Sequence, residues 1–218
     1  MKLLKTISSF IIVLALLFGV YAIYKNAQAP GAPSDDRGLK TYRNIKYGFE
    51  ITYPNTWQIY EDTTIPVINV YKVGETQKPP FTFHSDVTAI SIFPEGIGTE
   101  GIIGETASTT VVFSEPVATA FDHVLGDGTH WTTFAHFKDS MHIWNEFAFV
   151  SARVAVQDLQ QKCMTGEQEI DLDECLEFGI DHDGARLVRI GTIDANDRKT
   201  QEEILRSFHF LNPQMSPQ

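Results

Sequence analysis

Basic residues and cysteines are scarce in this chain of 218 residues. It contains 17 Lys and Arg against 28 Asp and Glu, a net charge of −11 at pH 7, and only two cysteines. An acidic surface argues against binding nucleic acid or anionic lipid through the folded part. The G-x-S-x-G, H-E-x-x-H and S-x-x-K patterns are also missing, so no residue is predicted to be catalytic from a motif.

A long uncharged run near the N-terminus predicts export. Thr6 to Tyr24 carry no charge, Lys2 and Lys5 precede them, and Lys25 alone follows directly. At about 1.5 Å per residue, this run nearly spans the ~30 Å apolar core of a bilayer. We expect residues 1–25 to form a signal-anchor transmembrane helix. The protein is then anchored in the cell membrane by a single pass. The charge bias predicts that its N-terminus lies in the cytoplasm and its domain outside the cytoplasm.

Cleavage of this segment is the alternative. Ala27-Gln28-Ala29 matches the A-x-A pattern of signal peptidase sites, and cleavage after Ala29 would make the protein secreted. The next residue is Pro30, whose tertiary amide is a poor bond for a signal peptidase. No cysteine follows the run, so a lipoprotein anchor at this site is excluded.

Composition divides the rest of the chain into three parts. Residues 26–40 are rich in Ala, Pro, Gly and charged residues, which predicts a spacer. We expect residues 41–211 to form the extracytoplasmic domain and residues 212–218 to form a short polar tail. Apolar and polar residues alternate from Tyr47 to Tyr53, which is typical of a half-buried strand. Further strands are predicted at 66–73, 87–93, 108–113, 117–124, 129–137, 144–157 and 186–190, with a hairpin turn at 126–128.

Helix signals are fewer. Thr200 to Glu203 match a capping box, and Ile204, Leu205 and Phe208 would share one face of the helix that follows. A weaker helix is predicted around 173–178. Many strands with few helices, and no alternating βαβ pattern, predict an α+β fold, in which an antiparallel sheet is flanked by helices.

Two short segments carry a resemblance to a known family. YGFEITYPNTW at 47–57 resembles the opening hairpin of PsbP-like domains, and EILRSFHF at 203–210 is similar to the closing helix and strand of exported bacterial proteins of that type. The resemblance implies an antiparallel sheet flanked by helices over 41–211. It also implies an accessory or binding role rather than an enzymatic one.

The two cysteines predict a disulfide. Cys163 and Cys175 are an even pair in a domain expected outside the membrane, and the sequence between them is polar and acidic. Free thiols or a metal pair are the alternatives, although two cysteines alone do not make a zinc site.

Other patterns suggest ligands less strongly. Calcium could take oxygens from four aspartates, namely Asp171, Asp173, Asp181 and Asp183. However, Cys175 and Leu176 break the EF-hand spacing, which favours a solvated acidic loop.

The glycines at 96, 98 and 101 match G-x-G-x-x-G, yet no helix is predicted after them, so we expect a flexible loop rather than a dinucleotide site. A histidine metal site is conceivable among His123, His130, His136 and His142, whereas ordinary polar positions on strands are favoured.

These patterns favour a membrane-tethered extracytoplasmic binding or accessory module that is not catalytic. We expect the membrane and an envelope protein as its partners, with no nucleic acid and no obligatory cofactor. The alternative is an envelope hydrolase or metal-dependent enzyme that uses His and Asp side chains. That enzyme would need several of His123, His130, His142, Asp181 and Asp183 in one cleft.

Overall fold

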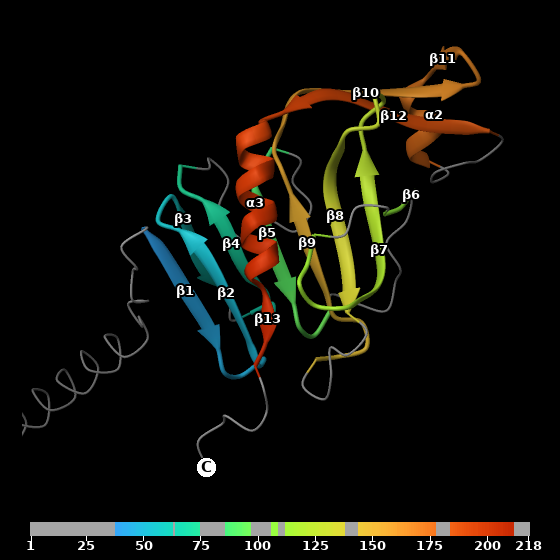
Figure 1. Ribbon diagram of the computed structural model, residues 1–218. Coiled ribbons are helices and arrows are strands. Elements are labelled where there is room, and N and C mark those ends of the chain that lie inside the picture. The colour runs from blue at the N-terminus through green and yellow to red at the C-terminus, as the bar shows by residue number, and fades with distance from the viewer. Residues whose placement is uncertain are drawn as a thin grey trace, which may run out of the picture. The chain divides into compact units, whose positions relative to one another are not determined.

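The computed structural model describes residues 38–62, 64–74, 86–96, 106–108, 112–137, 144–177 and 184–211. Strands dominate it, and Figure 1 shows their arrangement. The strands are β1 (Leu39–Asn44), β2 (Phe49–Pro54), β3 (Trp57–Glu61), β4 (Ile68–Lys72), β5 (Ala89–Phe93), β6 (Thr106–Ala107), β7 (Val117–Val124), β8 (His130–Phe137), β9 (Phe149–Arg153), β10 (Val156–Thr165), β11 (Gln168–Ile170), β12 (Ala185–Ile193) and β13 (His209–Phe210). The helices are α2 (Leu172–Glu177) and α3 (Ala195–Ser207).

The strands form three antiparallel sheets. The largest has seven strands in the order β3-β4-β5-β9-β8-β7-β6, and the two smaller ones have the orders β1-β2-β13 and β11-β10-β12. The predicted turn between β7 and β8 is confirmed, with the Leu125 amide donating to the Thr129 carbonyl at 2.8 Å and Gly128 at φ +86°. At Gly128 the positive φ favours glycine over other residues.

The main core lies between α3 and one face of the seven-stranded sheet. Ile204, Leu205 and Phe208 pack in one cluster with alternate residues of β4, β5 and β9 and with the buried positions of β2. The predicted alternation at 47–53 is confirmed, since Phe49, Ile51 and Tyr53 are buried and the residues between them are only partly so. Figure 1 shows α3 crossing this sheet and leading into β13.

The predicted α+β class is wrong. The fold is mainly β, with three antiparallel sheets, and α3 is the single helix of more than two turns among the residues that the structure describes. The weaker helix predicted around 173–178 is confirmed as α2, but it is only six residues long and lies beside β10 and β12. The described strands of the large sheet pair as antiparallel neighbours, and a tight turn such as that between β7 and β8 joins two of them without a helix.

The beginning of the helix also differs from the prediction. α3 starts at Ala195, and Asp194 caps it by accepting hydrogen bonds from the amides of Asn196 at 2.7 Å and Asp197 at 3.2 Å. Thr200 therefore lies within the helix rather than at its start. Aspartate is as favourable a cap as threonine, and its position six residues earlier adds more than a turn of helix.

Two predicted strands are shorter or divided. The run 144–157 contains β9 and the start of β10, separated by Val154 and Ala155, while Trp144 lies before β9. Of the run 108–113, the described residues Ser108, Val112 and Phe113 are outside any strand, and the short β6 precedes them. The hairpin β10–β11 was not predicted, because its sequence is polar on both faces.

The predicted transmembrane segment, 1–25, lies outside the described residues, as do most of the spacer and the tail. Within the ranges given above, no helix is both long enough and apolar enough to cross a membrane.

Candidate functional site

Polar side chains line the centre of the seven-stranded sheet on the face opposite α3. Val150 and Ala152 of β9 point toward the α3 core, so the alternate residues Ser151 and Arg153 point to the other face. Strand register places Asn69, Ser91 and Ser151 side by side on β4, β5 and β9, and each has 0% exposure. Ser91 Oγ donates to Asn69 Oδ1 at 2.8 Å. We call this surface the polar face.

A second row of the polar face carries a buried cation. Arg153 on β9 pairs with Thr132 on β8, which pairs with His123 on β7. Arg153 is 2% exposed, and its Nη2 donates to Ser151 Oγ at 3.1 Å. Burial lowers the pKa of Arg153 to about 10. The guanidinium therefore still carries its charge at neutral pH.

On Asn69 and Thr132 of this face, one polar side-chain atom each is buried without a hydrogen-bond partner. They are Asn69 Nδ2 and Thr132 Oγ1, and the second belongs to a residue with 3% exposure. Buried polar atoms are nearly always paired, and leaving one unpaired costs about 1–3 kcal/mol. Such atoms beside a charged Arg153 are typical of a site whose ligand completes the hydrogen bonds.

His123 ends the second row among aromatic rings. Its ring centroid lies 5.6 Å from that of Trp131 and 5.2 Å from that of Phe134. Burial, followed by the charges of Arg189 and Arg153, lowers the pKa of His123 to about 4, against a weaker opposing effect of Asp122. The imidazole is therefore neutral at physiological pH.

Replacing His123 with phenylalanine is expected to flatten the acid dependence of stability. Because the pKa of His123 is lower in the folded chain than in the unfolded one, the unfolded state binds the proton first, and stability falls between about pH 6.5 and about pH 4. Allowing for partial exposure, wild type should lose about 1–2 kcal/mol more than His123→Phe between about pH 7.5 and about pH 4.5. Urea unfolding at the two pH values measures the difference. Equal losses would contradict it.

Asp122 forms a separate cluster with His130 and Thr133. The Asp122 side chain is fully buried, accepts from Thr133 Oγ1 at 2.7 Å through Oδ1, and lies 2.7 Å from His130 Nδ1 through Oδ2. A carboxylate in this position orients the imidazole ring and selects its tautomer. Thr133 is saturated by the same carboxylate, so the described cluster offers an oriented base but no activated nucleophile.

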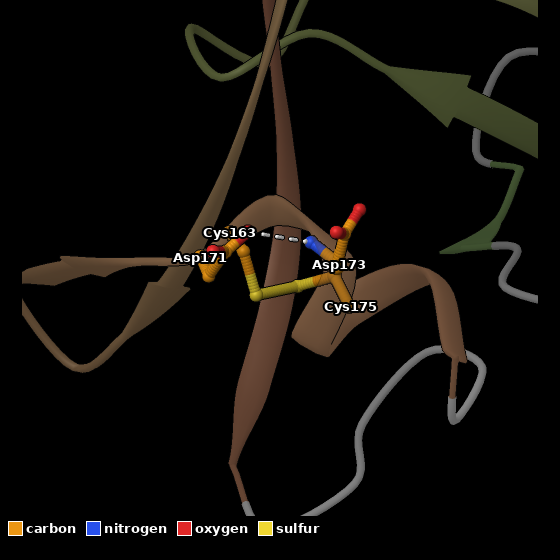
Figure 2. Close-up of a disulfide and its surroundings, with 4 residues drawn as sticks. All are labelled: Cys163, Asp171, Asp173 and Cys175. Carbon is orange, nitrogen blue, oxygen red and sulfur yellow. Dashed lines mark hydrogen bonds between the residues drawn. A yellow bond between two sulfur atoms is a disulfide. The ribbon is translucent and has the colours of Figure 1, made fainter.

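The predicted disulfide is confirmed. Cys163 on β10 is bonded to Cys175 on α2, with 5.6 Å between their Cα atoms. It ties α2 against the hairpin of β10 and β11 (Figure 2). Asp171 Oδ1 accepts from the Asp173 amide at 3.1 Å, so Asp171 acts at the start of α2, and Figure 2 shows the Asp173 carboxylate directed away from the disulfide.

The other predicted ligand residues do not converge where they can be followed. His136 Nδ1 lies 3.1 Å from the Ala148 carbonyl oxygen, apart from the partners of His123 and His130. His142, Asp181 and Asp183 lie outside the described residues, as do the glycines at 98 and 101. In the part of the chain that the structure describes, no three His, Cys, Asp or Glu side chains are grouped to hold a metal ion.

Sequence reasoning missed the polar face. A signal was present, since Ser91, Ser151 and Arg153 interrupt strands that otherwise read as apolar on both faces. That alternation identifies polar positions inside a core, but it does not say which of them are neighbours.

Comparison of the chain with protein-family models, curated proteins and solved structures finds no match, so function has to be inferred from geometry and chemistry.

Proposed function

We propose that this protein is a membrane-tethered extracytoplasmic binding module whose contact surface is a disulfide-closed arm. The arm consists of β10, β11, α2 and β12, and the disulfide that closes it is the observation on which the proposal rests. Disulfides persist in oxidising compartments outside the cytoplasm. The hydrophobic N-terminal segment and its flanking lysines supply the tether and the direction of export.

The arm has the chemistry of a surface for a basic partner. Residues 156–193 contain nine acidic and three basic residues, a large share of the net charge of the chain. The tip from Thr165 to Glu169 is exposed, and β11 forms one edge of the three-stranded sheet. An edge strand offers unpaired backbone groups to an incoming chain, and opposite charge would steer a basic envelope protein toward it.

The base of the arm is fixed to the rest of the domain. The Gly126 amide donates to the Arg189 carbonyl at 2.7 Å, and Val156, Leu159 and Ile193 pack with Leu125 and Trp131. A rigid base with an exposed tip limits the entropy that is lost when a partner binds.

An envelope hydrolase is the second candidate, favoured by the oriented imidazole of His130 beside Asp122. It ranks lower because Thr133, the hydroxyl in contact with Asp122, is buried and already donates its proton to that carboxylate. We therefore propose binding rather than catalysis.

Photocrosslinking in intact cells tests the binding surface. A photoreactive residue at Gln168 is expected to give a discrete adduct with one basic envelope protein, because this exposed position lies on β11. The matched control is the same residue at Arg43, an exposed position of β1. Immunoblotting of the membrane pellet after alkaline carbonate extraction measures the amount of adduct and shows whether the protein stays in the membrane.

Three outcomes would contradict the proposal. An identical adduct from Arg43 would remove the arm as the contact surface, and so would an undiminished adduct in the Cys163→Ser/Cys175→Ser variant. Release of the full-length protein from the pellet into the soluble fraction would remove the tether.

A further inference from the structure

The polar face reaches solvent at β3, the edge strand of the seven-stranded sheet. Trp57 and Ile59 of this strand pack in the main core on the side of α3. Gln58 and Tyr60 alternate with them and therefore point to the polar face. Both side chains are exposed, Tyr60 to 39%. The polar face thus begins with an amide and a phenol that a ligand in solution can touch.

Strand register extends these two positions onto β4. Gln58 lies directly opposite Tyr71, and Tyr60 lies directly opposite Asn69. Residues that are directly opposite in an antiparallel pair share a face, and diagonal neighbours about 7–8 Å apart are within reach of aromatic side chains. Tyr60 and Tyr71 are such a diagonal pair. Two tyrosines and two amide side chains, none of them charged, therefore form one group, which we call the tyrosine patch.

Asn69 supplies an unused donor to the tyrosine patch. Its side chain has 0% exposure, and its Oδ1 accepts from Ser91 Oγ at 2.8 Å. Its Nδ2 is buried without a hydrogen-bond partner. Buried N–H groups are nearly always paired, so this atom indicates an acceptor that binding would bring. Because Tyr60 stands opposite Asn69 on the edge strand, an acceptor that comes from the β3 edge passes the Tyr60 side chain.

We infer that the tyrosine patch binds a neutral oligosaccharide. The C–H groups of a sugar ring carry partial positive charge and pack on the negative face of an aromatic ring. The diagonal arrangement lets Tyr60 and Tyr71 contact successive sugar rings. Sugar hydroxyls both donate and accept, as do the side-chain amides of Gln58 and Asn69. The patch has no formal charge with which to select an ionic ligand.

A proline-rich peptide is the other ligand that packs on exposed aromatic rings. Proline has no backbone N–H, so such a peptide offers carbonyl acceptors and few donors. The Gln58 side chain presents an acceptor as well as donors, and a ligand with hydroxyl groups satisfies both. The chemistry of the patch therefore favours the sugar.

Titration calorimetry on the full-length chain tests this site, in a detergent without a sugar headgroup. The probes are chitohexaose, cellohexaose and maltohexaose, and wild type is expected to bind at least one of them with millimolar affinity or better. Tyr60→Ala should weaken that binding about tenfold and Gln58→Ala about fivefold, whereas Tyr60→Phe keeps the ring and should stay within about twofold. The matched control is Phe147→Ala. Phe147 is also 39% exposed but lies outside the patch, beside Gly96.

Four results would overturn the proposal. They are the absence of binding to all three sugars, undiminished binding by Tyr60→Ala, an equal loss in Phe147→Ala, and tighter binding of decaproline than of any sugar. Gln58 is an exposed side chain, so Gln58→Ala decides the matter if Tyr60→Ala fails to fold. The tyrosine patch includes no residue of the arm, and the Gln168 adduct is scored without sugar, so failure here leaves the proposed contact surface of the arm standing.

Discussion

Replacing Phe208 with alanine is expected to lower the free energy of unfolding by about 3–5 kcal/mol. The side chain has 0% exposure and lies where α3 ends and the chain turns toward β13. Removing it takes apolar surface out of the core and leaves a cavity that the surrounding sheet can only partly close. This is the largest effect that we expect from a single substitution.

The position of Phe208 among other rings explains the size of this effect. Its ring stacks on Phe49 at 5.4 Å and on Phe137 at 5.3 Å between centroids. It also meets the edges of Trp144 at 6.0 Å and Phe210 at 5.3 Å. Because these rings come from four separate segments of the chain, one truncation weakens contacts between β2, β8, β13 and the residues before β9.

Urea unfolding monitored by tryptophan fluorescence measures the change, with Phe147→Ala as the matched control. Phe147 is 39% exposed, so its truncation should change stability by less than about 1 kcal/mol. Similar losses in the two variants would show that the cluster around Phe208 is not the centre of the core.

Removing the disulfide by Cys163→Ser with Cys175→Ser is expected to reduce the stability of the arm by about 3 kcal/mol. The bridge closes a loop with a sequence separation of 12 and therefore restricts the unfolded chain. The arm has few apolar contacts of its own beyond its base, because most side chains of β10 are exposed or polar. It cannot replace the lost restraint by burial.

Hydrogen exchange localises this second effect. Amides of β11 and α2 should lose protection by a factor of about one hundred, whereas those of β5 and β9 should change little. Wild-type protein treated with a reductant is the control and should match the double variant. Unchanged protection in β11 and α2 would show that packing alone holds the arm.

The sequence determined several features because their causes are local. Alternation along 47–53 identifies the buried side of β2, since successive side chains of a strand point to opposite faces. The turn at 126–128 depends on glycine, and the disulfide was predicted from two cysteines in a domain that the sequence predicts to be exported. These signals need no knowledge of which strands are neighbours.

The start of the helix α3 was harder to predict, because it depends on contacts with distant parts of the chain. Thr200 and Asp194 are both acceptable caps, and local sequence does not choose between them. The choice follows from the packing of α3, whose first turn carries Asp197, which accepts from Lys72 Nζ of β4 at 2.8 Å. Tertiary contacts thus extended the helix, whereas the described residues contain no second helix of comparable length.

The polar face was decided only by the tertiary structure. The sequence shows that Arg153, Thr132 and His123 are polar residues within strands, and alternation assigns each of them to one face of its own strand. Their meeting depends on the order β9-β8-β7 and on the register between these strands, which includes a shift between His123 and Val124. A slip by one residue would turn the side chains of a strand to the other face. The sequence therefore determines the chemistry of each side chain, whereas long-range strand pairing determines which of these side chains are grouped together.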